Sequence, residues 1–174
     1  VQQGRGDRRE DTRCSNFRFE NTHLEIGAKP CEEELPYATC LDFMHQEVQD
    51  ERFDLIAETL LCYEVDGFEL QMNYVPHYFH PSEIEQGKSV LTDWIRRVYE
   101  EVKNSGPDRH LIIRIPASTA GCESVGMDVR TWINEGIVDA LVGQTFSGPE
   151  LINSNADYTD LVQAASGSNC KVIG

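Results

Sequence analysis

Residues that can take part in chemistry gather between positions 65 and 81, where the chain reads VDGFELQMNYVPHYFHP. Glu69 is followed at alternate positions by two amides, Gln71 and Asn73. In a β-strand, alternate side chains point to the same side, so these three groups would line one face. A carboxylate can take part in proton transfer, and amides bind hydroxyl groups. The stretch therefore predicts a strand with one polar, chemically competent face.

The other face of this strand is apolar, because Phe68, Leu70 and Met72 occupy the intervening positions. Such alternation is typical of a half-buried strand. Glu69 then has two interpretations. It is either a buried acid that needs a partner for purely structural reasons, or a site residue near the carboxyl end of the strand.

An aromatic loop with two histidines follows the strand. Within it, Tyr74, His77 and Tyr78 are candidates for contacting a ligand, since aromatic faces can stack on a ring and His77 can bind a hydroxyl group. The alternative is that the aromatic side chains pack against the end of the sheet. His77 and His80 have the spacing of a metal-binding pair on a helix, but prolines bracket them and no third ligand is evident. We predict no metal and no cofactor.

Charge limits the classes of partner. The 174 residues include 30 acids and 15 Lys or Arg, a formal charge of −15, which argues against nucleic acid and anionic membranes. No apolar run is long enough for a membrane span, and because the chain begins with Val we expect it to be part of a longer protein.

The six cysteines form no metal-binding pair, and we expect buried thiols, such as Cys62 and Cys170.

Strand and helix patterns alternate along the chain. Strands are expected at 37–42, 67–72, 110–118, 138–145 and 170–173, and helices at 46–63, 90–102, 129–135 and 159–165. This order predicts an α/β fold with a parallel sheet, and we interpret it as a partial (β/α)8 barrel with about five strands. Residues 1–35 are expected to be an irregular segment contributing loops, and residues 36–174 the partial barrel. A doubly wound sheet is the alternative, but no glycine-rich phosphate loop follows any strand.

Two segments carry a resemblance to a known family. LDFMHQEV at 41–48 and YEVDGFEL at 63–70 resemble the pattern of glycosyl-hydrolase-like family 10 and related glycoside-hydrolase-like proteins. These show a Leu-(Asp/Asn)-x-x-His-Pro-Glu-Val-Arg run, then a helix, then Tyr-Asp-Val-Asp-Gly opening a barrel strand. The likeness extends from about residue 15 to the end, with Gln46 and Gln49 replacing the usual Pro and Arg. It implies a TIM barrel that acts on carbohydrate.

Glycoside hydrolysis usually requires two carboxyl groups facing one cleft. Glu69 is the first candidate, and Arg114 lies where it could pair with Glu69. Asp42 and Glu150 are candidates for the second, although either could instead be a cap or a solvated loop residue. Relatives commonly carry an Asp at the position of Gln71, and an amide cannot act as nucleophile or ordinary general base. The alternatives are therefore a non-catalytic barrel that binds carbohydrate or protein, and a metal-dependent barrel hydrolase using the two histidines.

An incomplete barrel would expose unpaired strand edges, which usually pair with something else. We therefore expect either a longer natural chain or association into a homo-oligomer.

Overall fold

The computed structural model describes residues 15–31, 35, 37–145 and 156–174. At its centre lies a parallel sheet of four strands in the order β1-β2-β3-β4. The strands are β1 (Gly67–Gln71), β2 (His110–Pro116), β3 (Ala140–Gln144) and β4 (Lys171–Ile173). The predicted α/β fold with a parallel sheet is confirmed.

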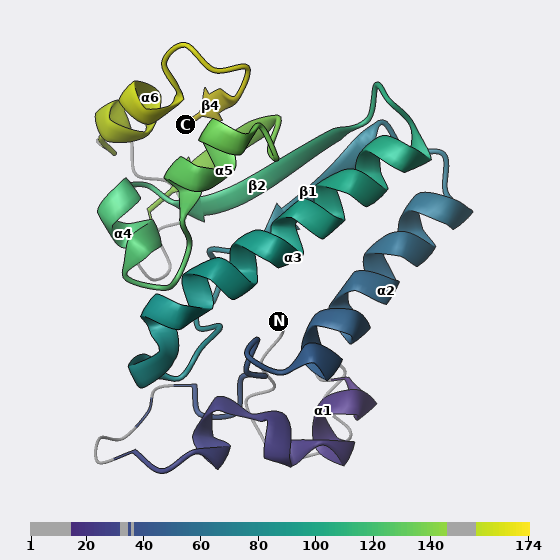
Figure 1. The fold of residues 1–174 in the computed structure, drawn as a ribbon, viewed down its shortest axis with the longest axis vertical. Coiled ribbons are helices and arrows are strands. Elements are labelled where there is room, and N and C mark those ends of the chain that lie inside the picture. The colour runs from purple at the N-terminus through teal and green to yellow at the C-terminus, as the bar shows by residue number, and fades with distance from the viewer. Residues whose placement is uncertain (1–14, 32–34, 36, 146–155) are drawn as a thin grey trace.

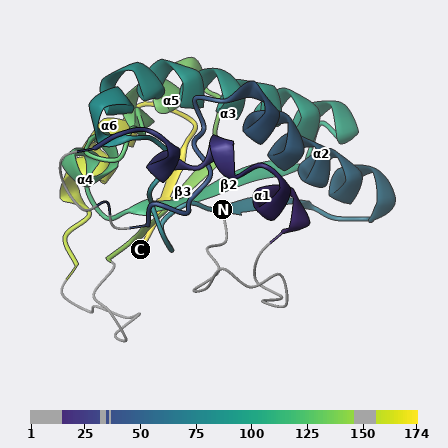
Figure 2. The same ribbon diagram turned by 90° about the horizontal axis from the view of Figure 1, so that it is seen from below.

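Four longer helices connect and cover these strands. They are α2 (Gln46–Cys62), α3 (Ile84–Ser105), α5 (Val129–Glu135) and α6 (Thr159–Ala165). Helix α2 packs on α3, α3 on α5, and α5 on α6, which makes a continuous row. Figure 1 shows α2 and α3 running side by side, and Figure 2 shows α2, α3 and α5 on the same side of the sheet.

The two faces of the sheet differ in exposure. On β2, Leu111, Ile113 and Ile115 are fully buried against the helices, whereas Ile112 and Arg114 between them are only partly buried. The strand register brings the partly buried and exposed side chains together as one surface. We call this surface the open face, and it includes Glu69, Gln71, Ile112, Arg114, Val142, Gln144, Lys171 and Ile173.

Local sequence signals explain where the helices begin and end. The side chain of Asp128 accepts a hydrogen bond from the Thr131 amide at the start of α5, and Gly136 ends it with a φ of 68°. Both caps follow residue preferences, since Asp favours the position before a helix and Gly the left-handed position that ends it. The two tryptophans, Trp94 and Trp132, belong to the core and are 5% and 0% exposed.

Asp139 fixes the amino end of the sheet. Its carboxylate accepts hydrogen bonds from the Leu111 amide at 2.7 Å and from Lys103 Nζ at 2.9 Å. Lys103 belongs to α3 and Leu111 to β2, while Asp139 precedes β3. One carboxylate therefore joins α3 and β2 to the start of β3.

The prediction of a strand at 37–42 is wrong. Tyr37 adopts a left-handed φ of 65°, and the Cys40 amide donates to the Tyr37 carbonyl, which makes a turn. Leu41 forms only an isolated antiparallel bridge with Glu25. The described residues therefore give a sheet of four strands instead of about five, because the alternating apolar residues here serve a turn that packs on the body.

The amino-terminal segment is more ordered than expected in its described part. It contains a short helix α1 (Asn16–Glu20) and the 3-10 turns η1 (Thr22–Leu24) and η2 (Ile26–Ala28). Two further short elements, η3 (Pro81–Glu83) and α4 (Thr119–Glu123), were also missed, because they are shorter than a detectable period. Among the thiols, Cys170 is buried as expected, but Cys62 is exposed at the end of α2.

Candidate functional site

Glu69 and Arg114 form the ion pair that the sequence suggested. Arg114 Nε and one of its terminal nitrogens donate to Glu69 Oε1 at 2.9 and 2.8 Å. Both side chains belong to the open face, and the Glu69 side chain is 42% exposed. Within the described chain, Glu69 Oε2 has no hydrogen-bond partner. The structure therefore excludes a fully buried Glu69 and leaves one carboxylate oxygen available to a ligand.

The two amides of the polar strand behave differently. Gln71 is exposed, and its Oε1 accepts a hydrogen bond from the Asn73 amide at 3.0 Å. Asn73 is 2% exposed, and its Nδ2 donates to the carbonyl of Gln144 at 2.8 Å. This bond runs from the end of β1 to the end of β3, past β2, and so ties the carboxyl ends of the strands together. Asn73 is held in place, whereas Gln71 is exposed and its amide nitrogen makes no hydrogen bond within the described chain.

Gln144 was missed by the sequence analysis. It ends β3 on the same side of the sheet as Gln71, and its Oε1 is buried with no hydrogen-bond partner in the described chain. The signal available was a polar residue closing an almost continuous apolar strand. Such a residue at a strand end is a site candidate in parallel sheets.

Asp42 lies in a different setting from Glu69. It is fully buried, and its carboxylate accepts from Lys29 Nζ at 2.8 Å and from the Met44 amide at 2.9 Å. Burial lowers the pKa of Lys29, but the hydrogen bonds that Lys29 donates to Asp42 and Glu83 outweigh burial and hold that pKa above its usual value. These contacts give Asp42 a role in joining the amino-terminal segment to the body, and no contact in the described chain joins it to Glu69.

The aromatic residues after β1 divide into exposed and buried ones. Tyr74 is 65% exposed and so remains accessible to a ligand. Tyr78 is 5% exposed, its hydroxyl donates to the Met72 carbonyl at 2.7 Å, and burial raises its pKa. The hydroxyl of Tyr78 is therefore already hydrogen-bonded within the protein, although the ring of Tyr78 lines a cavity.

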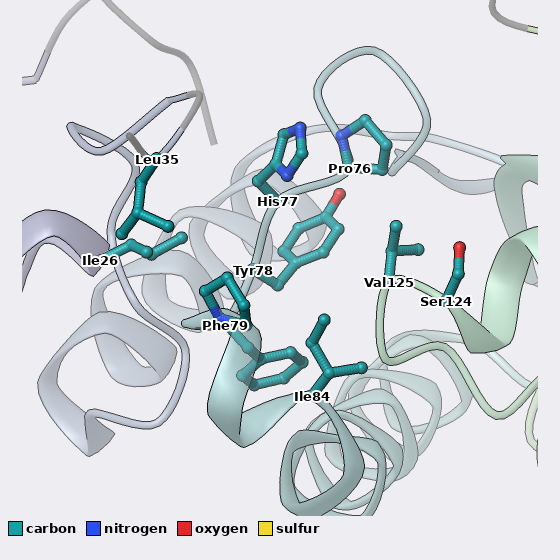
Figure 3. Close-up of a pocket in the computed structure, with 10 residues that line it drawn as sticks. Ile26, Leu35, Pro76, His77, Tyr78, Phe79, Ile84, Ser124 and Val125 are labelled. Carbon is teal, nitrogen blue, oxygen red and sulfur yellow. The ribbon is translucent and has the colours of Figure 1, made fainter. Parts of the chain in front are cut away.

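His77 and Tyr78 contribute to a cavity of about 210 Å³ (Figure 3). The imidazole of His77 lies 4.6 Å from the Tyr37 ring between centroids, and burial lowers its pKa. Glu69 and Arg114 do not line this cavity. The residues predicted from sequence therefore form two sites: an ion pair with a neighbouring amide on the open face, and an apolar cavity beyond the end of β1.

The two histidines do not form a metal site. His80 Nδ1 accepts from the Ser82 amide and lies 2.7 Å from Ser82 Oγ, so it caps η3. Among the described residues, no group of three His, Cys, Asp or Glu is arranged to hold a metal ion. Glu150, the other candidate for a second carboxylate, lies outside the described residues.

Comparison with known proteins adds no relative. No protein-family model matches the chain, and no curated protein matches it. Within the described part of the chain, none of the helices has the length and apolar character needed to cross a bilayer.

Proposed function

We propose that the chain is part of a glycoside-hydrolase-like (β/α)8 barrel that binds carbohydrate on the open face of its sheet. The observation that carries this proposal is the Glu69 and Arg114 pair, which presents a free carboxylate oxygen on an accessible face. The resemblance of segments 41–48 and 63–70 to glycoside-hydrolase-like proteins supplies the ligand class.

The topology supports a barrel over a doubly wound sheet. The strands follow one another in sequence order, and α2, α3 and α5 lie on one side. Right-handed crossovers between consecutive strands keep their helices on the same side, whereas a doubly wound sheet reverses its strand order. In a barrel, the side without helices is the interior, and ligands bind at the carboxyl-terminal end of the strands, toward which Gln71 and Arg114 lie beside Glu69.

The open face has the polar groups that a sugar needs. Glu69 Oε2 accepts hydrogen bonds, the Gln71 amide nitrogen donates them, and the exposed ring of Tyr74 follows at the end of the strand. Carbohydrate hydroxyl groups both donate and accept, so this mixture suits them. A carboxylate already oriented by an arginine also loses less rotamer freedom on binding.

Binding without hydrolysis is the form of the proposal that the contacts favour. Glu69 is the single carboxylate that the four described strands direct to the open face. Two carboxyl groups about 5 to 10 Å apart are usual for glycoside hydrolysis, and Asp42 is buried in its own ion pair. Hydrolysis remains the second candidate function, supported by the family resemblance, with Glu69 as the carboxylate that contacts substrate.

The test is calorimetric titration of the chain with a panel of neutral oligosaccharides, repeated with Glu69→Gln and Arg114→Met. We expect saturable binding that weakens at least tenfold in either variant, because each loses part of the oriented pair. Release of reducing sugar is followed in the same samples, which separates binding from hydrolysis.

The matched controls are Glu135→Gln and Arg96→Met. These residues form a comparable exposed ion pair at 2.6 Å, but on the helical side of the molecule. Their variants should bind as the unchanged chain does. Equal affinity in the Glu69 and control variants, or no binding of any oligosaccharide by folded protein, would remove the proposal.

A further inference from the structure

The cavity beyond the end of β1 has a closed apolar floor and an open mouth. Ile26, Tyr78 and Phe79 form the floor and are at most 5% exposed. Pro81 and Ser124 are exposed at the rim. Figure 3 shows side chains around the space from the loop after β1, from the end of α4 and from the amino-terminal segment. A molecule entering past the rim would be enclosed by apolar surface.

The volume selects a small occupant. At about 210 Å³, the cavity exceeds the space of about 150 Å³ that holds a benzene molecule in an apolar protein interior. It is smaller than the usual range of about 300 to 1,000 Å³ for pockets that take drug-sized ligands. One six-membered ring with a small substituent therefore fits, and a second ring does not.

The polar groups around the cavity are few and mostly engaged. The Tyr78 hydroxyl donates to the Met72 carbonyl, and the Ser124 hydroxyl donates to the Gly121 carbonyl. The His77 imidazole contacts the Tyr37 ring but makes no hydrogen bond within the described chain. The cavity can thus satisfy one hydroxyl group through His77, with the Ser124 oxygen as a further acceptor.

The small number of free polar groups makes the cavity better suited to an aromatic ring than to a sugar ring. A monosaccharide would bury several hydroxyl groups without partners, and each unpaired group has an unfavourable free energy. A phenol buries an apolar ring and a single hydroxyl. Aromatic rings also pack favourably against the edges and faces of other rings, and Tyr78 and Phe79 provide them.

We infer that this cavity is a binding site for a single phenolic ring, with the ring on the floor formed by Ile26, Tyr78 and Phe79 and the hydroxyl bonded to His77. The site is separate from the open face, and it does not depend on carbohydrate binding there. It gives the loop after β1 a recognition role of its own.

The test is a nuclear magnetic resonance titration of the 174-residue chain with phenol, toluene and glucose. Phenol should bind saturably and shift the His77 ring signals, and glucose should leave those signals unchanged. Val125→Trp fills the cavity and should weaken phenol binding at least tenfold. His77→Phe should weaken phenol about fivefold, the worth of one hydrogen bond, and leave toluene unchanged.

Val162→Trp is the control, because Val162 is exposed on α6 and does not line this cavity. If Val125→Trp fails to fold, Ser124→Trp at the exposed rim blocks the same mouth. Circular dichroism verifies that each variant is folded. Phenol binding that is absent, or unchanged in the folded cavity-blocking variant relative to Val162→Trp, would overturn the inference.

Discussion

Adjacent residues of β2 belong to two different environments. Ile113 is 0% exposed under the helices, whereas Ile112 and Arg114 on either side of it are only partly buried on the open face. Parallel sheets are normally covered on both faces. The side of the sheet beneath the helices therefore contributes to the buried core, while the other side carries the accessible pair of Glu69 and Arg114.

The largest loss of stability should come from a substitution on the face of the sheet that lies beneath the helices. Ile113→Ala removes a fully buried side chain and leaves a cavity, so we expect a loss of about 2 to 5 kcal/mol in the free energy of unfolding. Ile112→Ala, one residue away on the open face, should cost less than about 1 kcal/mol. Urea denaturation measures both. Equal losses would contradict the division between the two faces.

Asp139→Ala should cause the second largest loss of stability. It removes the acceptor for the Leu111 amide and the partner of Lys103, and a buried unsatisfied amide costs about 1 to 3 kcal/mol. Asp93→Ala, an exposed acid paired with Arg96, is the control and should change stability by less than about 0.5 kcal/mol. If both variants melt at the same temperature, Asp139 does not hold the amino end of the sheet.

Glu69→Gln should have a small effect on stability. The carboxylate is 42% exposed and Arg114 is 31% exposed, and ion pairs in such settings contribute about 0 to 1 kcal/mol. A change within that range, measured by thermal unfolding, would show that the pair is dispensable for folding. A loss above about 2 kcal/mol would make Glu69 a structural residue and weaken its assignment to a ligand.

The smallest effect concerns pH and the cavity loop. Burial lowers the pKa of His77 below its usual value of about 6.5, so the unfolded chain binds a proton more readily than the folded one. The stability linked to His77 is complete above about pH 6.5 and is lost as the pH falls through the lower folded pKa. His77→Gln should flatten the pH dependence of unfolding in that window.

His23→Gln provides the comparison, since His23 is exposed in η1. Because His23 does not line the cavity, this variant reports the effect of replacing a histidine outside the cavity loop. The same flattening in both variants would mean that burial of His77 has no effect on stability.

The sequence predicted the fold correctly where apolar and polar residues recur with a regular period. The alternation in β1 and β2 and the caps of α5 were readable because apolar burial and capping act locally. The strand at 37–42 was wrong because the left-handed backbone of Tyr37, set by its surroundings, overrides the local pattern. Short elements such as α4 have too few residues to show a period.

The candidate site could be predicted only in part. Glu69 and Arg114 were found together because adjacent parallel strands bring their polar positions to one face. The burial of Asp42 and Tyr78 depends on contacts with Lys29 and Met72, which local sequence does not encode. The same is true of Gln144, whose role follows from the bond between its carbonyl and Asn73.

The most direct test of the account is to map the carbohydrate contact surface by nuclear magnetic resonance on the isotopically labelled chain. An oligosaccharide found to bind by calorimetry is titrated, and backbone and side-chain shifts are followed. The account predicts shifts at Glu69, Gln71 and Arg114 on the open face, with Leu111 and Ile113 beneath the helices unaffected. Shifts confined to the helical side, or to the cavity lined by His77, would contradict the assignment of carbohydrate binding to the open face.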